Sequence, residues 1–501
     1  MGRVADAVPK VRRARSEHPR STREVYLKGT DRWQVSYYAR ERRGRRGEEI
    51  AQVTLDDRSG KVTEAWTGFQ VAWTMARGYE GAFGRKVNAP YVWVPLCLLF
   101  LLPFVDPRRP LRLLHLDLLV LLGFSVSYAY FNAAEIGTSV TLVYPPLAYL
   151  LVRLLALALR RGDGSRRPPE PLRLLVPVSW LVVGLIFLVG FRVGLNIVNS
   201  NVIDVGYSGL IGADRLMDGK RVYGTFPADN QHGDTYGPVN YYAYVPFEQA
   251  LPWSGSWDEL PGAHVAAVVF DLGCLLLIFL LGRRIRGPTL GIVLAYAWAA
   301  YPFTLLVMNS NANDSLVALL ILATLLVASS PAARGIGVAL AGLTKFAPLA
   351  LAPLFATYGG RQGPGRILRP ATLVAFAAAF AITLAVAMLP VLLDGSASLE
   401  TFWERTLGFQ EERGSPFSLW GQHGELGALQ TAVQIAAAAL AVALALVPRG
   451  RDLVTLAALA GVVIVALQLG VTHWFYLYLV WFFPLTMIAL LGPFAEPART
   501  R

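Results

Sequence analysis

The chain has 501 residues, of which 54% are hydrophobic and only 16% are charged. This composition is too apolar for an ordinary soluble protein and predicts a polytopic membrane protein. The formal net charge of +12 comes largely from arginines in short loops and near the N-terminus, which favours membrane topology and lipid contact over nucleic-acid binding. The two cysteines, Cys97 and Cys274, lie in apolar runs, so no disulfide framework is expected.

Residues 1–88 are predicted to form a small polar α/β domain. After a helical start, strand-like runs cover 33–40 and 49–55, and a turn then leads into another strand, which indicates a hairpin. The hairpin resembles the repeat unit of PepSY domains, where a strand ending in acid, a Ser/Thr-Gly turn and a valine strand recur. Residues 69–79 carry apolar side chains at helical spacing and predict an amphipathic helix along the membrane interface. The start of the chain has no apolar core, so we expect no signal peptide there.

Apolar runs predict about eleven transmembrane helices, each needing about 20 residues to cross a bilayer. The first three form an N-terminal membrane extension at 89–173, and the first of them is short; the rest belong to a membrane core at 174–501. The runs are 91–105, 113–130, 139–159, 174–191, 263–281, 290–308, 315–328, 371–393, 429–447, 453–471 and 475–491.

Residues 335–358 differ from these runs because Lys345 and two prolines interrupt an otherwise apolar stretch. Interrupted helices at membrane depth are tolerated where they line a polar cavity, so a broken or re-entrant helical pair is predicted. The predicted fold is therefore an all-α polytopic membrane protein with this pair and a small N-terminal α/β domain.

Arginine placement predicts the orientation in the membrane. Three short loops are rich in arginine and are expected in the cytoplasm: Arg108, Arg109 and Arg112; Arg160, Arg161, Arg166 and Arg167; and Arg283, Arg284 and Arg286. The span that begins at residue 174 then runs outward, so the loops at 195–262 and 394–430 face each other outside the cytoplasm. If the first run crosses the membrane, the N-terminal domain also lies outside.

The outer loop at 201–247 is unusually rich in acids and tyrosines. Its first acid, Asp204, follows a predicted span and is itself followed by a helix-like sequence. Tyrosine and acid side chains suit hydroxyl-rich ligands, because sugar rings offer CH faces for stacking and OH groups for hydrogen bonds. We expect ligand contacts from Tyr207, Arg215, Tyr223, Asp229, His232, Asp234 and Tyr236.

Several loose motifs follow one another in a fixed order along residues 174–491. They are Asp204, Tyr207, Gly219 with Tyr223, Tyr236-Gly237-Pro238, an Asn-rich loop at 309–314, a Lys-x-x-Pro interruption from Lys345, serines at 415 and 418, and His473-Trp474. This order resembles the GT-C glycosyltransferases, specifically glycosyltransferase family 87, the polyprenyl-phosphate-dependent mannosyl and arabinosyl transferases. The chain departs from the family at Gly237, where a second proline is usual, and in its long N-terminal extension.

The resemblance implies inverting transfer of a hexose or pentose from a polyprenyl-phosphate donor to an extracytoplasmic glycolipid or glycan. Asp204, at the outer headgroup level, would act as the general base. Cationic side chains would stabilise the leaving phosphate, and the candidates are Arg192, Arg215, Lys345 and Arg405. The other substrate-binding residues it implies are Asn311, Asp314, Ser415, His473 and Trp474.

Each assignment has a structural alternative. Asp204 could serve as a helix N-cap. Lys345 could extend to the cytoplasmic headgroups, and His473 could belong to an interfacial aromatic belt. The acids and histidine at 229–234 could be solvated, and their spacing also permits a divalent cation, although no zinc-ligand pattern occurs and no metal site is predicted.

Two further charged features favour structural roles. The run at 411–413 indicates a solvated face, and Asp271, inside a span, indicates an ion pair within the bundle. For the whole protein, the alternatives to an enzyme are a membrane transporter or lipid flippase and a noncatalytic sensor built on the N-terminal domain. Transporters usually contain internal repeats, and none is visible in this sequence.

Overall fold

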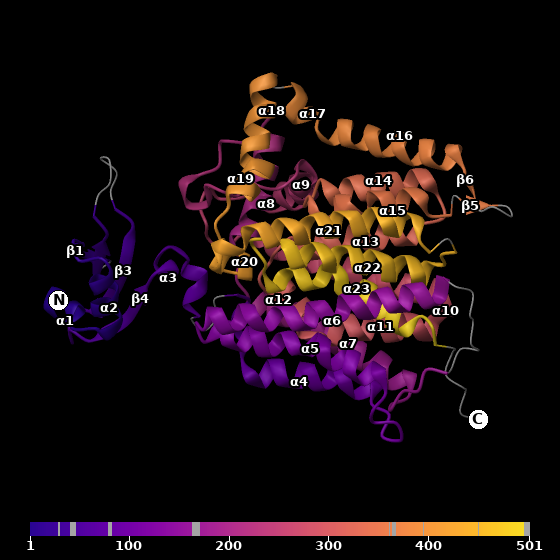
Figure 1. The fold of residues 1–501 in the computed structure, drawn as a ribbon, viewed down its shortest axis with the longest axis horizontal. Helices are drawn as coiled ribbons and strands as arrows, with labels where there is room; N and C mark the ends of the chain where they lie inside the picture. The colour runs from indigo at the N-terminus through magenta and orange to yellow at the C-terminus, as the bar shows by residue number, and fades with distance from the viewer. Residues whose placement is uncertain are drawn as a thin grey trace. The chain divides into compact units, whose positions relative to one another are not determined.

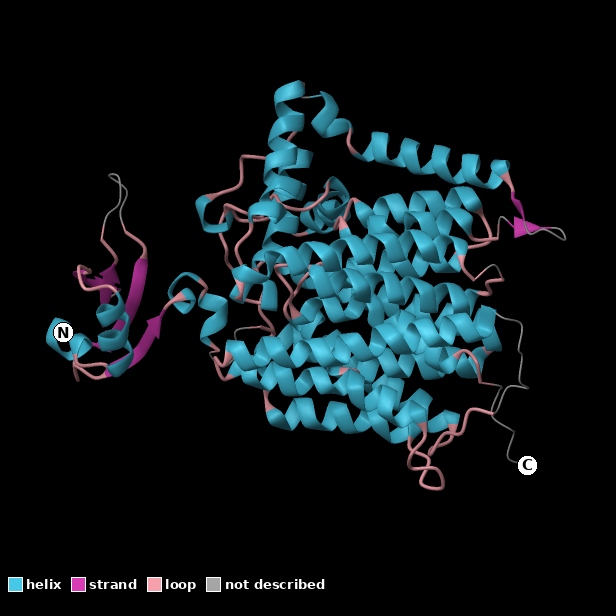
Figure 2. Cartoon of the chain, in the orientation of Figure 1, coloured by secondary structure: helices cyan, strands magenta, loops and turns pink. Residues whose placement is uncertain are grey.

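The structure, a computed structural model, describes residues 1–28, 31–40, 47–78, 83–162, 171–359, 361–362, 367–393, 395–448 and 450–494. It is mostly helical, with a small sheet near the N-terminus (Figures 1 and 2). The chain divides into two compact units. One contains Met1–Ala82 and Tyr128–Ser139, and the other contains Phe83–Ser127 and Val140–Arg501.

The N-terminal unit contains a four-stranded antiparallel sheet with the strand order β1-β2-β3-β4. Two helices, α1 (Gly2–Asp6) and α2 (Pro9–Glu17), contribute to its core, in which Val35 and Val53 pack with Val11. The predicted hairpin is confirmed, whereas the first strand was not predicted because all of its side chains are exposed and its apolar residues are consecutive. The strands are β1 (Thr22–Lys28), β2 (Arg32–Tyr38), β3 (Glu49–Asp56) and β4 (Val62–Thr67).

The amphipathic helix predicted at 69–79 is wrong as a single helix. The chain forms a short α3 (Phe69–Ala72) and then a 3-10 turn (Thr74–Arg77). The Arg77 guanidinium donates hydrogen bonds to the carbonyls of Gln70 and Val71, each at 2.9 Å, and folds the segment back on itself. Residue 79 lies outside the described residues.

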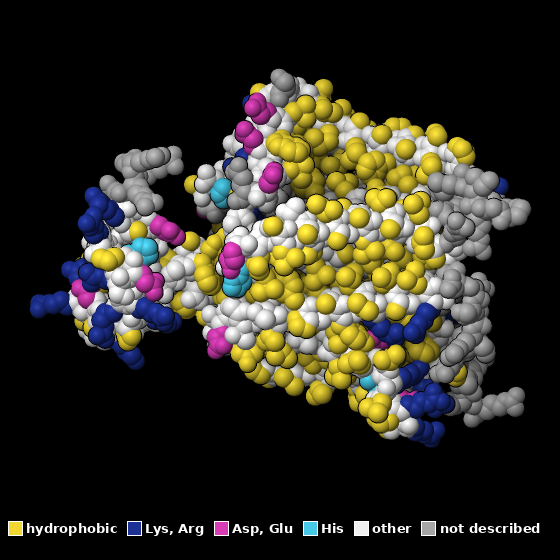
Figure 3. Space-filling view, in the orientation of Figure 1, with side chains coloured by type: hydrophobic (Ala, Val, Ile, Leu, Met, Phe, Trp, Pro, Cys, Tyr) yellow, Lys and Arg dark blue, Asp and Glu magenta, His cyan; other side chains and the backbone are white. Residues whose placement is uncertain are grey.

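Seven helices among the described residues are long and apolar enough to cross a membrane, by length and composition. The pair α11 (Pro288–Ala300) and α12 (Pro302–Asn309), which is bent by 60°, makes an eighth if the two helices count as one broken span. In the space-filling view, hydrophobic side chains cover most of the visible face of the helical region (Figure 3). The seven are α5 (Leu113–Asn132), α6 (Ile136–Gly162), α7 (Val178–Val198), α10 (Pro261–Arg286), α16 (Pro370–Ala387), α21 (Gly427–Leu446) and α22 (Leu453–Gly470).

The predicted count of about eleven spans is not confirmed. Three of the predicted spans are helical but shorter than 18 residues: α4 (Pro90–Leu101) with a following 3-10 turn, α13 (Asp314–Leu326), and α23 (Leu479–Leu491) with a preceding 3-10 turn (Tyr476–Tyr478). The last two follow segments without helix or strand, 310–313 and 471–475. Both segments contribute to the site described below.

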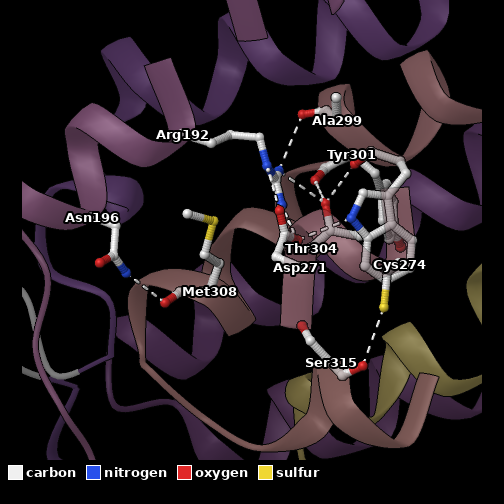
Figure 4. Close-up of polar contacts among 10 residues, drawn as sticks. Arg192, Asn196, Asp271, Cys274, Ala299, Tyr301, Thr304, Met308 and Ser315 are labelled. Carbon is white, nitrogen blue, oxygen red and sulfur yellow. Dashed lines mark hydrogen bonds and ion pairs between the residues drawn. The ribbon is translucent and has the colours of Figure 1, made fainter. Parts of the chain in front are cut away.

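A buried ion pair stabilises the bend between α11 and α12 (Figure 4). Arg192 of α7 contacts Asp271 of α10 with Nη2 and Oδ1 2.5 Å apart, and its Nη1 donates to the Ala299 carbonyl at 3.1 Å and to the Thr304 hydroxyl at 3.2 Å. The Trp298 indole donates to the same carboxylate at 2.9 Å. Buried charges need such complete pairing. The predicted pairing of Asp271 is confirmed, whereas Arg192 is wrong as a phosphate ligand because it is fully buried in this network.

The broken or re-entrant pair predicted at 335–358 is confirmed. It consists of α14 (Pro331–Gly342), a 3-10 turn (Ala347–Leu351) and α15 (Ala352–Thr357). Arg334, in the first turn of α14, donates to the carbonyls of Phe355 and Tyr358, each at 2.8 Å, so the two outer ends of the pair meet. The chain therefore reverses at 343–346, and Lys345 lies at the tip.

The remaining elements lie at the two ends of the unit that contains Phe83–Ser127 and Val140–Arg501. Figure 1 shows α8 (Asp204–Met217), α9 (Pro238–Ala250) and α18 (Ser396–Trp403) at one end, with α19 (Phe409–Glu412) and α20 (Leu419–Gln422). The small hairpin of β5 (Arg361–Gln362) and β6 (Ile367–Leu368) lies at the other end. The short α17 (Leu389–Leu393) joins α16 to α18.

Candidate active site

The segment that leads into α8 is held against the turn between α12 and α13. The amide of Asn201 donates to the Asn309 carbonyl at 3.1 Å, and the amide of Ile203 donates to the Ser310 carbonyl at 3.2 Å. These two bonds run between segments more than a hundred residues apart in sequence. They fix the backbone immediately before Asp204.

Asn311 completes this attachment from the same turn. Its side-chain amide donates to the Asn201 carbonyl at 2.9 Å, and its backbone has a φ of +49°, a left-handed conformation that asparagine tolerates better than most residues. Its carbonyl lies so close to α8 that a Cβ added at Gly206 would be 2.1 Å from the oxygen. Only glycine allows this approach, so Gly206 and Asn311 together set the start of α8.

Asp204 is the first residue of α8, and Ile203, not Asp204, is the N-cap residue. The Asp204 side chain is accessible to solvent, yet burial raises the pKa of its carboxyl, while Arg413, the Val205 amide and Lys345 act in the opposite direction. The carboxylate is thus reachable from solvent although protein atoms surround it, and it is not among the residues that line the cavity described below. It is therefore open to a ligand.

Lys345 forms the centre of a buried cluster at the tip of the re-entrant pair. Its Nζ lies 2.6 Å from Oδ1 of Asp314, and the Trp481 indole donates to the same oxygen at 3.0 Å. The rings of Tyr236, Tyr478 and Trp481 each lie with their centroids 5.4 Å from Nζ. The alternative in which Lys345 extends to the cytoplasmic headgroups is wrong, because the ammonium is paired with a buried carboxylate.

A cavity of about 290 Å³ opens beside this cluster. Its polar lining includes Lys345, Arg413 and His473, and its apolar lining includes Phe346 and Leu467. Both Lys345 and Arg413 also act electrostatically on Asp204, so the carboxylate lies near the cationic part of the cavity. The remaining lining residues are Thr235, Tyr236, Ala347, Gln410, Gln434, Ile464, Gln468, Val471, Thr472, Tyr478 and Trp481.

His473 contributes a neutral imidazole to this wall. Burial, with the nearby charges of Arg413 and Lys345, holds the pKa of His473 well below its usual range. Its Nδ1 lies 2.9 Å from the Ser415 hydroxyl. If the hydroxyl donates this bond, Nε2 carries the proton and acts as a donor. His473 therefore lines the cavity, in addition to packing against the rings of Phe417 and Tyr478.

These groups define what the cavity can hold. One part presents two cationic side chains and a hydrogen-bonding imidazole, and another part is apolar. The arrangement suits an amphiphile with an anionic head. An accessible carboxylate near the cationic part can accept a proton from a second reactant.

The profile of glycosyltransferase family 87 matches residues 235–491, about half of the chain. The chain belongs to glycosyltransferase family 87. A comparison with curated proteins found no significant match. The resemblance predicted from the order of motifs is thus confirmed, and the protein is a multi-pass membrane glycosyltransferase. The matched segment includes Lys345, Arg413 and His473, whereas Asp204 lies before it, so the role of Asp204 rests on geometry.

Two of the predicted binding residues of this glycosyltransferase bind each other. Arg405 forms a bidentate ion pair with Asp234, with Nε to Oδ2 at 2.8 Å and Nη2 to Oδ1 at 2.7 Å. Asp234 is fully buried and also accepts a bond from the Gly224 amide at 2.7 Å. The pair links the 394–430 loop to the 201–247 loop. Arg405 was a candidate phosphate ligand, but in the structure its guanidinium binds Asp234.

Most other predicted residues in the first loop organise the loop itself. The Tyr207 hydroxyl donates to Asp229 at 3.2 Å, and the Tyr223 hydroxyl donates to the Tyr236 carbonyl at 3.0 Å. Arg215, another phosphate candidate, donates to the Thr225 carbonyl at 2.8 Å. These side chains are not part of the cavity lining given above. They hold the loop that presents Tyr236.

The remaining predicted residues lie at the edges of the site. His232 is exposed and stacks on the Phe409 ring, with centroids 4.9 Å apart. Trp474 is buried and donates to Oε1 of Gln468 at 2.9 Å. Within the described part of the chain, no three His, Cys, Asp or Glu side chains gather in a way that could hold a metal ion.

Sequence reasoning missed Arg413, which we interpreted as part of a solvated charge run. It lines the cavity and acts on Asp204, Lys345 and His473. Its proximity in sequence to two glutamates hid this role. The departure from the family at Gly237 also has a local reason: a Cβ there would lie 2.1 Å from the Leu343 carbonyl at the re-entrant tip.

Proposed function

We propose that this family 87 enzyme transfers a hexose or pentose from a polyprenyl-phosphate donor to an extracytoplasmic glycolipid or glycan, with inversion. Asp204 is the general base. The observation that carries the proposal is an accessible carboxylate of raised pKa beside a cavity that combines Lys345, Arg413 and His473 with an apolar wall.

In this mechanism the polyprenyl tail anchors the donor in the bilayer, and its phosphate lies against Lys345 and Arg413. Asp204 takes the proton of the acceptor hydroxyl as that oxygen attacks the anomeric carbon. The bond from the anomeric carbon to the phosphate oxygen breaks, and polyprenyl phosphate leaves. The two cations stabilise the charge that develops on it, and the neutral imidazole of His473 donates a hydrogen bond.

The distribution of arginines supports an extracytoplasmic site. At the end opposite α8, Arg286 donates to the Gly492 carbonyl at 3.4 Å, and Arg112 lies over the Phe494 ring at 4.6 Å. Basic residues at membrane boundaries favour the cytoplasmic side. Asp204 then faces the extracytoplasmic side. A lipid-linked sugar donor can serve there because it does not require a nucleotide.

The proposal is tested with purified protein in detergent, a radiolabelled polyprenyl-phosphate sugar and an extract of membrane glycolipids and glycans. We expect the label to appear in a new product, and partition between solvent and water then identifies a glycolipid or a glycan. A nucleotide sugar carrying the same label serves as the control donor and should give no product. Label that stays in the intact polyprenyl donor contradicts the proposal.

A further inference from the structure

The wall of the cavity that carries His473 has no regular secondary structure. Residues 471–475 connect α22 to the 3-10 turn Tyr476–Tyr478, and they contain neither helix nor strand. Val471, Thr472 and His473 nevertheless line the cavity. Backbone hydrogen bonds of a helix or sheet do not fix this segment, so side-chain contacts must determine its shape.

One side of the segment is held by the outer loop. The Ser418 hydroxyl donates to the Thr472 carbonyl at 2.6 Å, and Ser415 contacts His473 at 2.9 Å. Gln430 of α21 donates to the Thr472 hydroxyl at 2.9 Å. All of these residues belong to the segment that the family profile matches.

The other side is held by α5, which lies outside the matched segment. The hydroxyls of Ser127 and Tyr476 are 2.6 Å apart, and both side chains are almost completely buried. One turn earlier on α5, Phe124 stacks on Trp474 with ring centroids 6.2 Å apart. The N-terminal extension therefore contacts the irregular segment at Trp474 and the start of the 3-10 turn at Tyr476, on either side of Phe475.

These contacts lead directly to groups that line the cavity. The Trp474 indole is bonded to Oε1 of Gln468, and the Gln468 amide donates to the Tyr478 carbonyl at 3.0 Å. The Tyr478 ring is one of the three that surround the Lys345 ammonium. A shift of Tyr476 would therefore displace the wall at His473 on one side and at Tyr478 on the other.

We propose that Ser127 and Tyr476 are positioning residues: their contact makes α5 part of the donor site by holding the wall between His473 and Tyr478. The inference rests on the proposed function only for its kinetic readout. The N-terminal extension is then a functional component of this enzyme rather than an independent appendage.

The test compares Ser127→Ala, Tyr476→Phe and the double variant in the full-length protein. Ser125→Ala is the matched control, because Ser125 is on the same helix but lies next to Cys97 of α4. In hydrogen-exchange mass spectrometry, we expect faster exchange of the peptide covering residues 472–477 in both single variants and unchanged exchange in the control. Since one buried contact is lost, KM for the polyprenyl-phosphate donor should rise about three- to tenfold, with a smaller change in kcat.

The effect of the double variant should be smaller than the sum of the two single effects, because each single variant already removes the contact between the two hydroxyls. Unchanged exchange in Ser127→Ala, or an equal effect in Ser125→Ala, would overturn the inference. Faster exchange with an unchanged donor KM would overturn it too, by showing a purely structural contact. If the wild-type protein transfers no sugar, the proposed function fails, and the exchange experiment still decides whether the contact holds the wall.

Discussion

Replacing Asp204 by asparagine is expected to abolish transfer and leave the protein folded. The substitution keeps the shape of the side chain but removes its ability to accept a proton. A positioned general base typically contributes a factor of about 10²–10⁴ to the rate, which corresponds to about 3–5 kcal/mol in the activation barrier. Burial disfavours the charged form of Asp204, so the neutral amide removes a desolvation cost. The thermal midpoint at neutral pH should equal or exceed that of the wild type.

The pH dependence of the wild-type rate follows from the same shift. The base works only when it is ionised, and its folded-state pKa is raised, so the rate is lost as pH falls through a pKa higher than that of an ordinary aspartate. The sign for stability is opposite: the folded protein holds this proton more tightly than the unfolded chain does, so the contribution to stability declines as pH rises through the folded pKa.

Initial rates with labelled donor, measured from acidic to neutral pH, test the loss of activity in Asp204→Asn and the pH dependence of the wild-type rate. Asp218→Asn is the control, because Asp218 is an exposed carboxylate of the same loop that pairs with Lys220 at 2.6 Å. It should transfer at the wild-type rate. Near-normal turnover by folded Asp204→Asn, or an equal loss in the control, would refute the role of the base.

Three other substitutions test the contacts that hold the site around Asp204. Lys345→Gln leaves a buried carboxylate unpaired and should lower the free energy of unfolding by about 3–5 kcal/mol, measured by thermal unfolding in detergent. Gly206→Ala forces a Cβ against the Asn311 carbonyl and should reduce kcat about a hundredfold, whereas Gly194→Ala, where nothing lies within 4 Å, should not. Arg405→Gln unpairs the buried acid that links the two outer loops, so limited proteolysis should cut the 201–247 loop faster, and unchanged cleavage would argue against the link.

Much of the membrane fold could be predicted from the sequence because lipid requires continuous apolar helices. The runs at 113–130, 263–281 and 453–471 all correspond to observed helices. The bend in 290–308 was not predicted, since the run is apolar throughout. A local signal was present: Pro302 disfavours helix at Tyr301, which has an extended backbone with a ψ of 122°. The contacts from Arg192 that stabilise the bend come from another helix, and no periodicity reveals them.

The site could be predicted only in part, for a similar reason. Lys345 stood out because a charged residue in an apolar run is costly and needs a local partner. Arg413 did not, because a charge near other charges usually indicates solvent. Arg405 and Asp234 are 171 residues apart. Each was a reasonable ligand candidate by type, and their mutual pairing depends on how the two outer loops meet.

The turn between α12 and α13 explains how Asp204, outside the matched family segment, comes to lie near Lys345 inside it. Asn311 bonds to the segment before Asp204, and Asp314, three residues later, binds the Lys345 ammonium. One short stretch, which begins where α12 ends, therefore contacts both the segment before Asp204 and the Lys345 side chain. The position of Asp204 relative to Lys345 is consequently set by this turn. Neither outer loop alone could fix it, because Asp204 belongs to one of them and Lys345, at the tip of the re-entrant pair, belongs to neither.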